Sequence, residues 1–386
     1  MENIIVGAGL SGAVLANLIA DKLGEKVVVI DRRCVVGGNI YDYKDKETGI
    51  TVQKYGPHIF HTNNKKVWDY LSKFTKWNYF FFKPNAIMEG NCVSIPFNLT
   101  TLYELFSESM AQRIEEKLIN RFGYGVKVPI LKLRDEDDED LKFIAQYIYK
   151  HMFENYTSKQ WGLKPEEIDP SVTARVPIFI SHDCRYFQDK YQGIPINGYT
   201  KMIENMLNHP NIEVKLNTDS KEYVIFSHNE NGVDSLKKVS SCKRIFYSGA
   251  IDEFFDYKYG QLPYRSLDFD IQTVDKEYFQ KSAMTNYPNN YDFTRITEHK
   301  YFLNEKSDKS VISIEYPQQF VLGENERYYP ISNSDTQNLY ERYNDEAAKI
   351  DGLYFIGRLG EYKYYNMDLA VERIFELFEK IGGLNA

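Results

Sequence analysis

The sequence is poor in cysteine. Its 386 residues include only four cysteines, at positions 34, 92, 184 and 242, and none of them forms a Cys-x-x-Cys pair. Such wide spacing disfavours both a disulfide framework and a zinc site. We therefore expect no metal centre, and we expect the protein to work in a reducing compartment, the cytoplasm.

Long apolar runs are also missing. No run approaches the ~20 residues that span a bilayer. The chain opens directly on a predicted strand, without the charged and apolar regions of a secretory signal peptide. We expect neither membrane insertion nor secretion, and no internal repeat or low-complexity segment stands out.

An excess of positive charge is absent as well. The formal net charge is −8, which disfavours nucleic acid as a partner. A few local arginines can still hold an anionic small molecule. Aromatic residues are abundant, with 31 tyrosines, and binding of sugar or base rings is one use for them.

The first forty residues contain the most informative motif. Residues 3–6 read as a short strand, and Gly7, Gly9 and Gly12 follow it at the start of a helical pattern. A second strand, residues 27–30, ends on Asp31. In a β-α-β unit these glycines form the turn, admit a pyrophosphate and let helix and strand pack closely, while the acid binds a ribose. The pattern predicts a Rossmann-like dinucleotide site.

The residues after Asp31 bear on the choice of dinucleotide. Arg32 and its neighbour Arg33 form a basic pair, and a second double glycine, Gly37 and Gly38, precedes Asn39. This arrangement is more typical of FAD-binding flavoproteins than of NAD dehydrogenases. An ordinary glycine-rich loop is the alternative for Gly37 and Gly38.

Three further stretches carry polar or aromatic clusters. His58 and His61 flank an apolar pair beside a Gly-Pro turn, where solvent-facing polar residues are the alternative and a metal site lacks a third ligand. Residues 135–140 are all acidic, and we expect a solvated loop and a helix N-terminus there. Residues 185–195 mix cations with aromatics, which suits either a phosphate- and ring-binding site or a domain seam.

The remaining pattern predicts mixed α/β structure. We expect a hairpin over residues 79–95 and a helix from 102 to about 120, with Thr100 or Thr101 as its N-cap. Antiparallel strands dominate the middle and later chain. A strand near 353–356 and a helix over 367–381 predict that the chain returns to the nucleotide domain at its end.

Taken together, these motifs resemble the UDP-galactopyranose mutase family, flavoenzymes that interconvert UDP-galactopyranose and UDP-galactofuranose. The matching stretches run in order along nearly the whole chain: residues 7–12, 37–39, 55–62, 156–162, 175–177, 186–195, 198–200, 247–249, 294–300, 328–330 and 357–364.

The resemblance implies an α/β architecture with three parts. A discontinuous Rossmann-like FAD-binding domain would comprise residues 1–78, 196–250 and 340–386. An inserted helical domain with a mobile substrate loop would comprise residues 98–172. A twisted antiparallel sheet domain would comprise residues 79–97, 173–195 and 251–339. It also implies a homodimer.

The resemblance further implies roles for individual residues. Arg175 and Arg295 would hold the substrate diphosphate, which suits two planar guanidinium groups, and His61 would lie by the flavin and sugar. Implied substrate contacts also come from Phe153, Tyr156, Trp161, Tyr186, Tyr329 and Tyr364. The implied cofactor contacts are Gly7, Gly9, Gly12, Asp31, Arg32, Gly38, Asn39, His58 and Arg358.

The implied reaction needs no nucleophile from the protein. In this family N5 of the reduced flavin attacks the anomeric carbon, the nucleotide leaves, and the sugar recloses through its 4-hydroxyl. The product would serve cell-surface glycan synthesis. An FAD oxidoreductase of the amine oxidase type shares the N-terminal motif and is a competing class, and a non-catalytic nucleotide-sugar binder is another.

Three positions depart from the family pattern. Phe82 stands where an asparagine is expected near the sugar, Met152 replaces a phenylalanine beside the nucleotide, and Asn366 replaces an aspartate. A phenyl ring in place of an amide removes a hydrogen-bonding partner for a sugar hydroxyl. The preferred substrate is therefore open between UDP-galactopyranose and a related nucleotide sugar, such as dTDP-fucopyranose or UDP-N-acetylgalactosamine.

Overall fold

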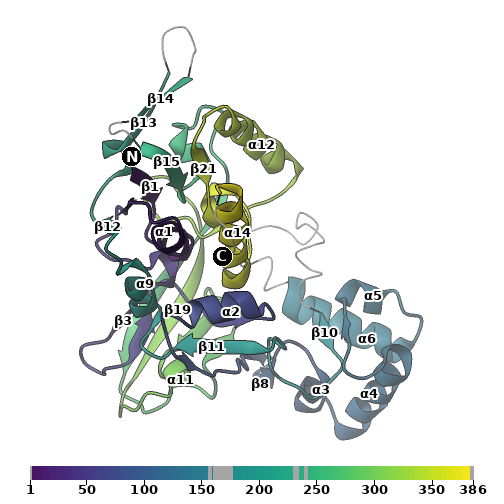
Figure 1. Ribbon diagram of the computed structural model, residues 1–386. Helices are drawn as coiled ribbons and strands as arrows, with labels where there is room; N and C mark the ends of the chain where they lie inside the picture. The colour runs from purple at the N-terminus through teal and green to yellow at the C-terminus, as the bar shows by residue number, and fades with distance from the viewer. Residues whose placement is uncertain (1, 155–158, 160–176, 229–233, 239–241, 383–386) are drawn as a thin grey trace.

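The computed structural model describes residues 2–154, 159, 177–228, 234–238 and 242–382. It confirms a mixed α/β fold with a Rossmann-like parallel sheet, a helical region and a twisted antiparallel sheet (Figure 1). Where the parts divide along the chain stays a proposal, with the boundaries given above.

The parallel sheet is assembled from segments far apart in the sequence. Its order is β12 (Ile212–Lys215), β2 (Val27–Ile30), β1 (Glu2–Val6), β15 (Cys242–Tyr247) and β21 (Leu353–Phe355). Every adjacent pair is parallel. The chain therefore returns to this sheet near its C-terminus, as the final strand and helix predicted.

Alternate residues of these strands face opposite layers, because successive side chains in a strand point to opposite sides. Ile5 and Val29 belong to the layer under the helices α1 (Leu10–Lys22), α2 (Lys65–Leu71), α9 (Tyr199–Leu207) and α14 (Met367–Lys380). Ile4 and Val28 belong to the opposite layer, with α10 (Ile251–Phe254) and α12 (Ser334–Ala348).

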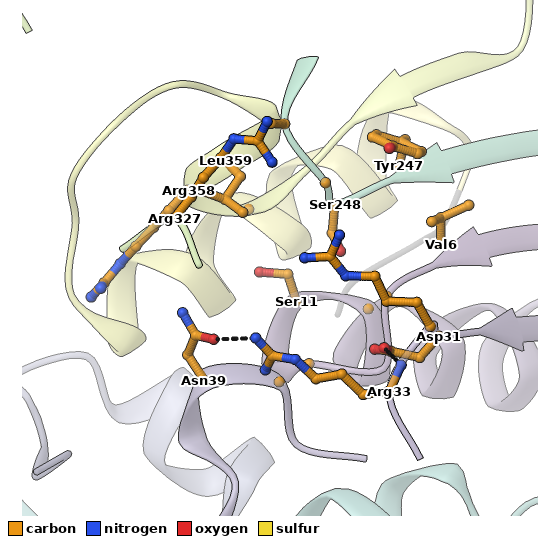
Figure 2. A pocket seen from close by; sticks show the side chains of 18 of the residues that line it. Val6, Ser11, Asp31, Arg33, Asn39, Tyr247, Ser248, Arg327, Arg358 and Leu359 are labelled. Carbon is orange, nitrogen blue, oxygen red and sulfur yellow. Dashed lines mark hydrogen bonds between the residues drawn. The ribbon is translucent and has the colours of Figure 1, made fainter. Parts of the chain in front are cut away.

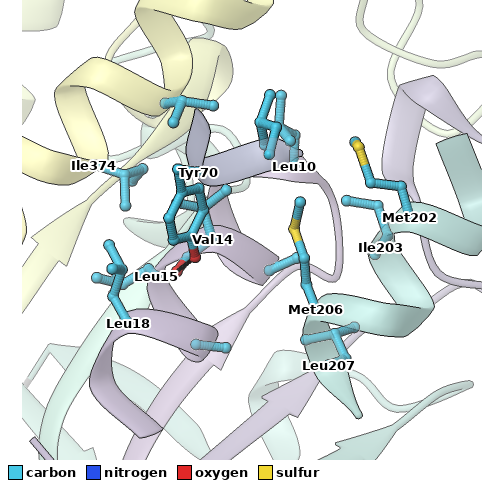
Figure 3. Packing of buried hydrophobic residues seen from close by; sticks show 14 of the residues in the cluster. Leu10, Val14, Leu15, Leu18, Tyr70, Met202, Ile203, Met206, Leu207 and Ile374 are labelled. Atoms are coloured by element: carbon cyan, nitrogen blue, oxygen red, sulfur yellow. Dashed lines mark hydrogen bonds between the residues drawn. The ribbon is translucent and has the colours of Figure 1, made fainter. Parts of the chain in front are cut away.

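Helix α1 lies at the centre of the first layer, between α9 and α14. Figure 3 shows Leu10, Val14 and Leu18 of α1 within this cluster, with Met206 of α9 and Ile374 of α14. Full burial of one such apolar side chain stabilises the fold by roughly 1.5–3 kcal/mol. The packing holds the N-terminus of α1 in place above the ends of β1 and β2.

The antiparallel sheet has seven strands. Its order is β20 (Tyr329–Pro330), β16 (Tyr264–Val274), β19 (Ser310–Gln319), β18 (Arg295–Glu298), β17 (Met284–Asn286), β7 (Asn85–Met88) and β8 (Asn91–Ser94). Only β17 and β7 pair in parallel. The predicted hairpin is present as β7 and β8, but residues 79–84 before it form no strand.

Smaller sheets complete the β structure. One sheet has the order β5 (Phe60–Thr62), β11 (Tyr191–Pro195) and β6 (Trp77–Asn78). Two further sheets pair β3 (Asp42–Lys44) with β4 (Thr51–Gln53) and β9 (Lys127–Val128) with β10 (Ile178–Phe179). The fourth is a hairpin of β13 (Val224–His228) and β14 (Asp234–Lys238). The last hairpin extends away from the parallel sheet (Figure 1).

The helical region corrects two expectations. The helix predicted from residue 102 to about 120 is divided into α3 (Leu99–Leu105) and α4 (Glu108–Phe122). Phe106 between them is extended and packs edge-on against Phe143 and Tyr147. The N-cap of α3 is Asn98, whose side chain accepts from the Thr101 amide, so Thr101 is its capping-box partner.

The acidic run has a structural use. Asp138 caps α6 (Glu139–Ile148) by accepting from the amides of Asp140 and Leu141 at 2.9 and 3.3 Å. Carboxylates at a helix N-terminus are stabilised by the helix dipole. Helix α5 (Ile130–Arg134) precedes this cap, and a π-helical turn (Tyr149–Glu154) follows α6. Two short helices, α11 (Lys300–Leu303) and α13 (Gly357–Gly360), lie in the later chain.

None of the helices within the described ranges has the length and apolar character needed to cross a bilayer.

Candidate functional site: two adjoining cavities

The two glycine turns lie against each other. Gly38 has a φ of +55°, and a Cβ built on it would come within 3.0 Å of the Gly9 Cα. Gly37 has a φ of +110°, and its amide donates to the Ala8 carbonyl at 2.9 Å. The second double glycine is thus required by close backbone approach, which an ordinary loop does not demand.

The first turn also needs its own glycines. A Cβ on Gly12 would lie 2.0 Å from the Gly7 carbonyl oxygen, so only glycine permits α1 to start there. Gly9 is the N-cap of α1 and offers no side chain to the first N–H groups of the helix. Those N–H groups and the helix dipole favour a negatively charged ligand at this end.

A cavity of about 380 Å³ opens over the two glycine turns, residues 7–12 and 37–38, which we call the cradle. Figure 2 shows Ser11, Asp31 and Arg33 from the N-terminal unit, with Ser248 and Arg358 from later segments, around it. All three motif glycines, together with Gly38, Asn39 and His58, contribute to its walls. Glycine backbone, a helix N-terminus, a carboxylate and cations fit the phosphates and ribose of a dinucleotide.

Asp31 lies where the motif predicts. Its two carboxylate oxygens accept from the amides of Ala8 and Arg33, each at 2.8 Å. The carboxylate therefore ties the glycine turn to the end of β2 while it lines the cavity.

The two arginines after Asp31 differ in placement. Arg32 also lines the cavity, but its side chain is 59% exposed and pairs with Glu326 at 2.9 Å. Arg33 is 18% exposed and donates to Asn39 at 3.1 Å (Figure 2). Its guanidinium also lies over the Tyr55 ring, 4.5 Å from the ring centroid. Only Arg32 was predicted as a cofactor contact, although Arg33 lines the cavity too and belongs to the same basic pair.

A second, larger cavity of about 940 Å³ adjoins the first. The two share Asn39, His58, Arg358, Tyr365 and Met367 as wall residues. The structure gathers ten of the residues predicted for substrate, sugar or flavin contact around the second cavity: Asn39, His58, His61, Phe82, Tyr186, Arg295, Tyr329, Arg358, Tyr364 and Asn366. They come from segments more than 300 residues apart.

Arg295 is the best-oriented cation of this cavity. Its Nε and one terminal nitrogen lie 2.7 and 2.6 Å from the same Glu315 oxygen. Glu315 is buried, and the Thr294 hydroxyl donates to its other oxygen at 3.3 Å. A buried charge pair with further hydrogen bonds holds a guanidinium in one geometry.

Two tyrosine hydroxyls line the same cavity as neutral donors. Burial raises the pKa of Tyr329 to about 12, although the nearby Arg295 charge opposes that shift. Burial also raises the pKa of Tyr186 above its ordinary value. Both phenols keep their protons at neutral pH and can donate to an anionic ligand.

Arg358 lies at the junction of the cavities. Its Nε donates to the Tyr365 carbonyl at 2.6 Å, and its guanidinium is 4.8 Å from the centroid of the Tyr364 ring. Tyr364 in turn lies 5.6 Å from the ring of Tyr329.

His58 is held neutral beside these arginines. Burial first, and then the Arg358 charge, lower the pKa of His58 to about 4. Its Nδ1 is 2.9 Å from the Gly56 carbonyl, which only accepts, so Nδ1 carries the proton. Nε2, which then carries a lone pair, is the other polar atom of the ring, and the ring lines both cavities.

His61 and Phe82 lie together at one wall. The His61 ring stacks on Phe187 with centroids 3.6 Å apart, and the Phe82 ring lies 6.2 Å from that of Phe187. The Nδ1 of His61 is 2.6 Å from Asp189. Sequence reasoning flagged the stretch 186–195 but singled out neither Phe187 nor Asp189, because no local spacing links them to His61.

Four predicted site residues cannot be placed. Tyr156, Trp161, Arg175 and the side chain of Phe153 lie outside the described part of the chain.

A buried hydrogen-bonded chain supports the loop that bears His58. The His58 amide donates to the Gln53 side chain, and the Gln53 amide donates to His299 Nδ1 at 3.3 Å. His299 Nε2 then donates to Ser313, on β19 of the antiparallel sheet. Burial lowers the pKa of His299 to about 3, so its ring is neutral.

Comparisons with known proteins agree with this geometry. The family model described as UDP-galactopyranose mutase matches residues 151–364, and the model of an NAD(P)-binding Rossmann-like domain matches residues 5–74. These matches and the glycine cradle support a flavin cofactor.

Two relatives are similar over nearly their whole length. A dTDP-fucopyranose mutase from Escherichia coli is 36% identical, over 97% of this chain and 96% of that protein. A probable UDP-galactopyranose mutase from Klebsiella pneumoniae is 37% identical, over 95% and 91%. A crystal structure of reduced UDP-galactopyranose mutase has a TM-score of 0.69 at 16% identity, covering 99% of this chain and 94% of that one, and shows the shared fold.

Replacing Gly9 by alanine should weaken flavin binding without unfolding the protein. A Cβ there meets its nearest neighbour, the Gly38 Cα, at an ordinary 3.6 Å, but Gly9 lines the cavity and is the glycine of the motif that admits the pyrophosphate. We expect the FAD dissociation constant to rise at least ~tenfold, or ~1.4 kcal/mol. Titration of apoprotein by flavin fluorescence measures it.

Gly12→Ala is the matched control for this prediction. Its Cβ would clash with the Gly7 carbonyl, so it should lower the free energy of unfolding by ~1–3 kcal/mol. Equal flavin affinity in Gly9→Ala and the wild type would contradict the assignment of the cradle.

His299 should make stability depend on pH. Its pKa in the folded protein, about 3, lies below the ordinary ~6.5, so the unfolded chain binds a proton first as the pH falls. Stability is therefore lost on acidification, by ~2 kcal/mol between pH 7 and pH 5. Urea unfolding of both proteins at pH 7 and pH 5 measures this. The loss of unfolding free energy between the two pH values should be ~2 kcal/mol smaller in His299→Gln than in the wild type. Equal losses in the two proteins would refute the assignment.

Proposed function

Because the chain belongs to the UDP-galactopyranose mutase family, we propose that it interconverts UDP-galactopyranose and UDP-galactofuranose. Enzymes of this family are isomerases, and so is this chain. The observation that carries the proposal is the second cavity, where Arg295 and three tyrosines face a space that shares five wall residues with the dinucleotide cavity.

The cofactor residues are proposed from the cradle. Gly7, Gly9 and Gly12 admit the pyrophosphate, and Asp31 binds the ribose. Further contacts to the cofactor come from Arg32, Arg33, Gly38, Asn39, His58 and Arg358. The chemistry that a bound, reduced flavin supplies is nucleophilic displacement at the anomeric carbon.

The chain itself binds and orients the nucleotide. Arg295, oriented by Glu315, neutralises the diphosphate as it leaves and returns, and Arg175 is its proposed partner. Tyr186, Tyr329 and Tyr364 donate hydroxyl hydrogen bonds to the same group. Preorganised donors aimed at developing charge lower the barrier more than the same groups do in water.

The remaining substrate contacts are proposed from the family pattern. Phe153 and Tyr156 would pack on the uracil, Trp161 would line the cleft, and Asn366 would lie near the sugar. Asn366 is the N-cap of α14 and lines the second cavity.

A second substrate is favoured by the apolar part of the cavity wall. Phe82 is 3% exposed, and the same cavity is also lined by Ala86, Ile95 and Met284, all apolar. An apolar wall accepts a methyl group and offers no partner to a hydroxyl. A 6-deoxy sugar such as the dTDP-fucopyranose named for the Escherichia coli relative is therefore the alternative substrate.

The deciding experiment incubates the reduced holoenzyme with UDP-galactopyranose and with dTDP-fucopyranose. Furanose product is read by chromatography, and kcat/KM is compared. We expect Phe82→Asn to shift the ratio toward the hydroxylated sugar by ~10-fold or more, the usual effect of one polar contact. An unchanged ratio removes Phe82 as the determinant, and absence of furanose product with both sugars refutes the proposed function.

Arg295→Ala tests the diphosphate clamp. Deletion of one preorganised donor costs ~2.7 kcal/mol or more, so kcat/KM should fall at least ~10²-fold. Dithionite keeps the flavin reduced during the assay. The control is Arg113→Ala. Arg113 is an exposed arginine of α4 that pairs with Asp140 and is not among the described residues lining either cavity, so this variant should leave kcat/KM near the wild-type value. Full activity in Arg295→Ala would contradict the clamp.

Three further points, on location, oligomeric state and the use of the product, complete the proposal. We propose a cytoplasmic location, since all four cysteines lie in described segments and are free thiols. We propose a homodimer, as the family resemblance implies, and sedimentation analysis measures it. We also propose that the furanose product feeds cell-surface glycan synthesis.

A further inference from the structure

His61 and Asp189 form a pair at the wall of the second cavity. The His61 ring on β5 lines the cavity, and its Nδ1 lies 2.6 Å from Asp189 Oδ2. Asp189 is not among the described residues that line either cavity. It therefore holds the imidazole from behind. A carboxylate only accepts, so Nδ1 carries a proton and Nε2 is the ring nitrogen left for the cavity.

The position of Asp189 is set by several bonds. Its other carboxylate oxygen accepts from the Asn63 amide nitrogen at 2.5 Å. The carbonyl oxygen of that amide accepts from the Lys190 backbone N–H at 2.9 Å. The Gln192 side chain, buried on β11 opposite His61, donates to the Asp189 carbonyl at 2.8 Å. The orientation of the Asn63 amide is therefore determined by its two partners.

The plane of the imidazole is held as well. The Phe187 ring lies parallel to it within 14°, at a centroid distance of 3.6 Å. Phe82 packs on Phe187, and the backbone carbonyl of Phe82 accepts from the Tyr186 amide at 2.8 Å. The His61 side chain is only 11% exposed. A ring fixed in tautomer and plane is what proton transfer at a defined atom requires.

Ring contraction of a pyranose needs such a transfer. The bond between C1 and O5 breaks and a bond between C1 and O4 forms. O5 becomes a hydroxyl and gains a proton, while the 4-hydroxyl becomes the ring oxygen and loses one. No proton is consumed overall, so one nitrogen that donates and then accepts suffices.

We propose that His61 Nε2 carries this proton and that Asp189 is the positioning residue that keeps Nδ1 protonated. In this step His61 starts as the imidazolium, with one proton on Nδ1 facing Asp189 and one on Nε2. Nε2 donates its proton to O5 as the C1–O5 bond breaks, and the ring, still protonated at Nδ1, accepts at Nε2 from the 4-hydroxyl as the C1–O4 bond forms. His61 therefore ends each turnover as it began. This inference rests on the proposed mutase function for its sugar chemistry. The pairing itself is a property of the protein.

Asp189→Asn is the informative variant. The Asn63 NH₂ group faces residue 189, because the Asn63 carbonyl is taken by the Lys190 amide. In the variant, the carbonyl of the introduced amide must then accept from Asn63, which turns the introduced NH₂ toward His61. That NH₂ donates to Nδ1, so the ring carries a single proton, on Nε2. Donation of that proton would leave an imidazolate, and while it stays Nε2 has no lone pair with which to accept another.

The first measurement is histidine ring ¹⁵N NMR of the purified protein, with the pH raised until the ring signals stop shifting, so that the singly protonated tautomer is read. The wild type should show His61 as the Nδ1–H tautomer and Asp189→Asn as the Nε2–H tautomer. His61→Gln assigns the signal. Asp183→Asn, the same change on the same segment at a carboxylate that pairs with Arg185, should keep the wild-type tautomer.

The second measurement is steady-state kinetics of the reduced holoenzyme with the nucleotide sugar that the wild type converts. Asp189→Asn should lower kcat by roughly 10²–10⁴-fold, as expected for loss of a positioned acid–base group. KM should stay within about threefold of the wild type, because the diphosphate contacts are elsewhere. A structural role alone would not couple a tautomer change to kcat.

Two results would overturn the inference. One is an unchanged Nδ1–H tautomer in Asp189→Asn. The other is a switched tautomer with kcat within about tenfold of the wild type, which is below the usual contribution of such a group. Inactivity of the wild type toward both nucleotide sugars would instead refute the proposed function, and it would remove the sugar step from this inference while the NMR result still tests the pairing.

Discussion

The close contact between the two glycine turns is the constraint on which the site depends. Gly9 and Gly38 approach so nearly that a single methyl group on Gly38 would reach the Gly9 backbone at 3.0 Å. This contact places the N-terminus of α1 beside Asn39 and, through the following strands, beside His58 and His61. Asn39, next to Gly38, is one of the five wall residues that the two cavities share. The layer of apolar side chains around α1 keeps the contact in register (Figure 3).

The charges of the site are arranged around this junction in a consistent way. Three arginines that line the cavities are each held by a partner: Arg33 by Asn39, Arg295 by Glu315 and Arg358 by the Tyr365 carbonyl. The titratable rings beside them are held neutral by burial, as the lowered pKa of His58 and the raised pKa of Tyr329 show. A protein with a net charge of −8 thereby offers a local cationic surface to a diphosphate. The paired groups cost little reorganisation when charge moves, which is the basis of electrostatic preorganisation.

The apolar wall and the histidine pair are linked through one aromatic stack. Phe82 packs on Phe187, and Phe187 packs on His61. A change at position 82, in the wall of the second cavity, therefore also bears on the ring that we assign to proton transfer. Relatives with names that specify different sugars lie at nearly equal identity, 36% and 37%. Overall similarity therefore does not separate those substrates.

Local properties of the chain were enough to predict the Rossmann-like unit, because glycine spacing, strand–helix periodicity and the Asp31 position can all be read along the sequence. The family, and the predicted site residues that line the second cavity, came from the resemblance of motifs spread along the chain. Local properties did not predict the division between α3 and α4 or the Asn98 cap, where the packing of Phe106 on α6 overrides a continuous helical pattern. Nor did they distinguish Arg33 from Arg32, since two adjacent residues differ only in which one the fold turns inward. The pairing of His61 with Asp189 arises only in the folded chain, since it joins residues 128 positions apart through the register of β5 and β11.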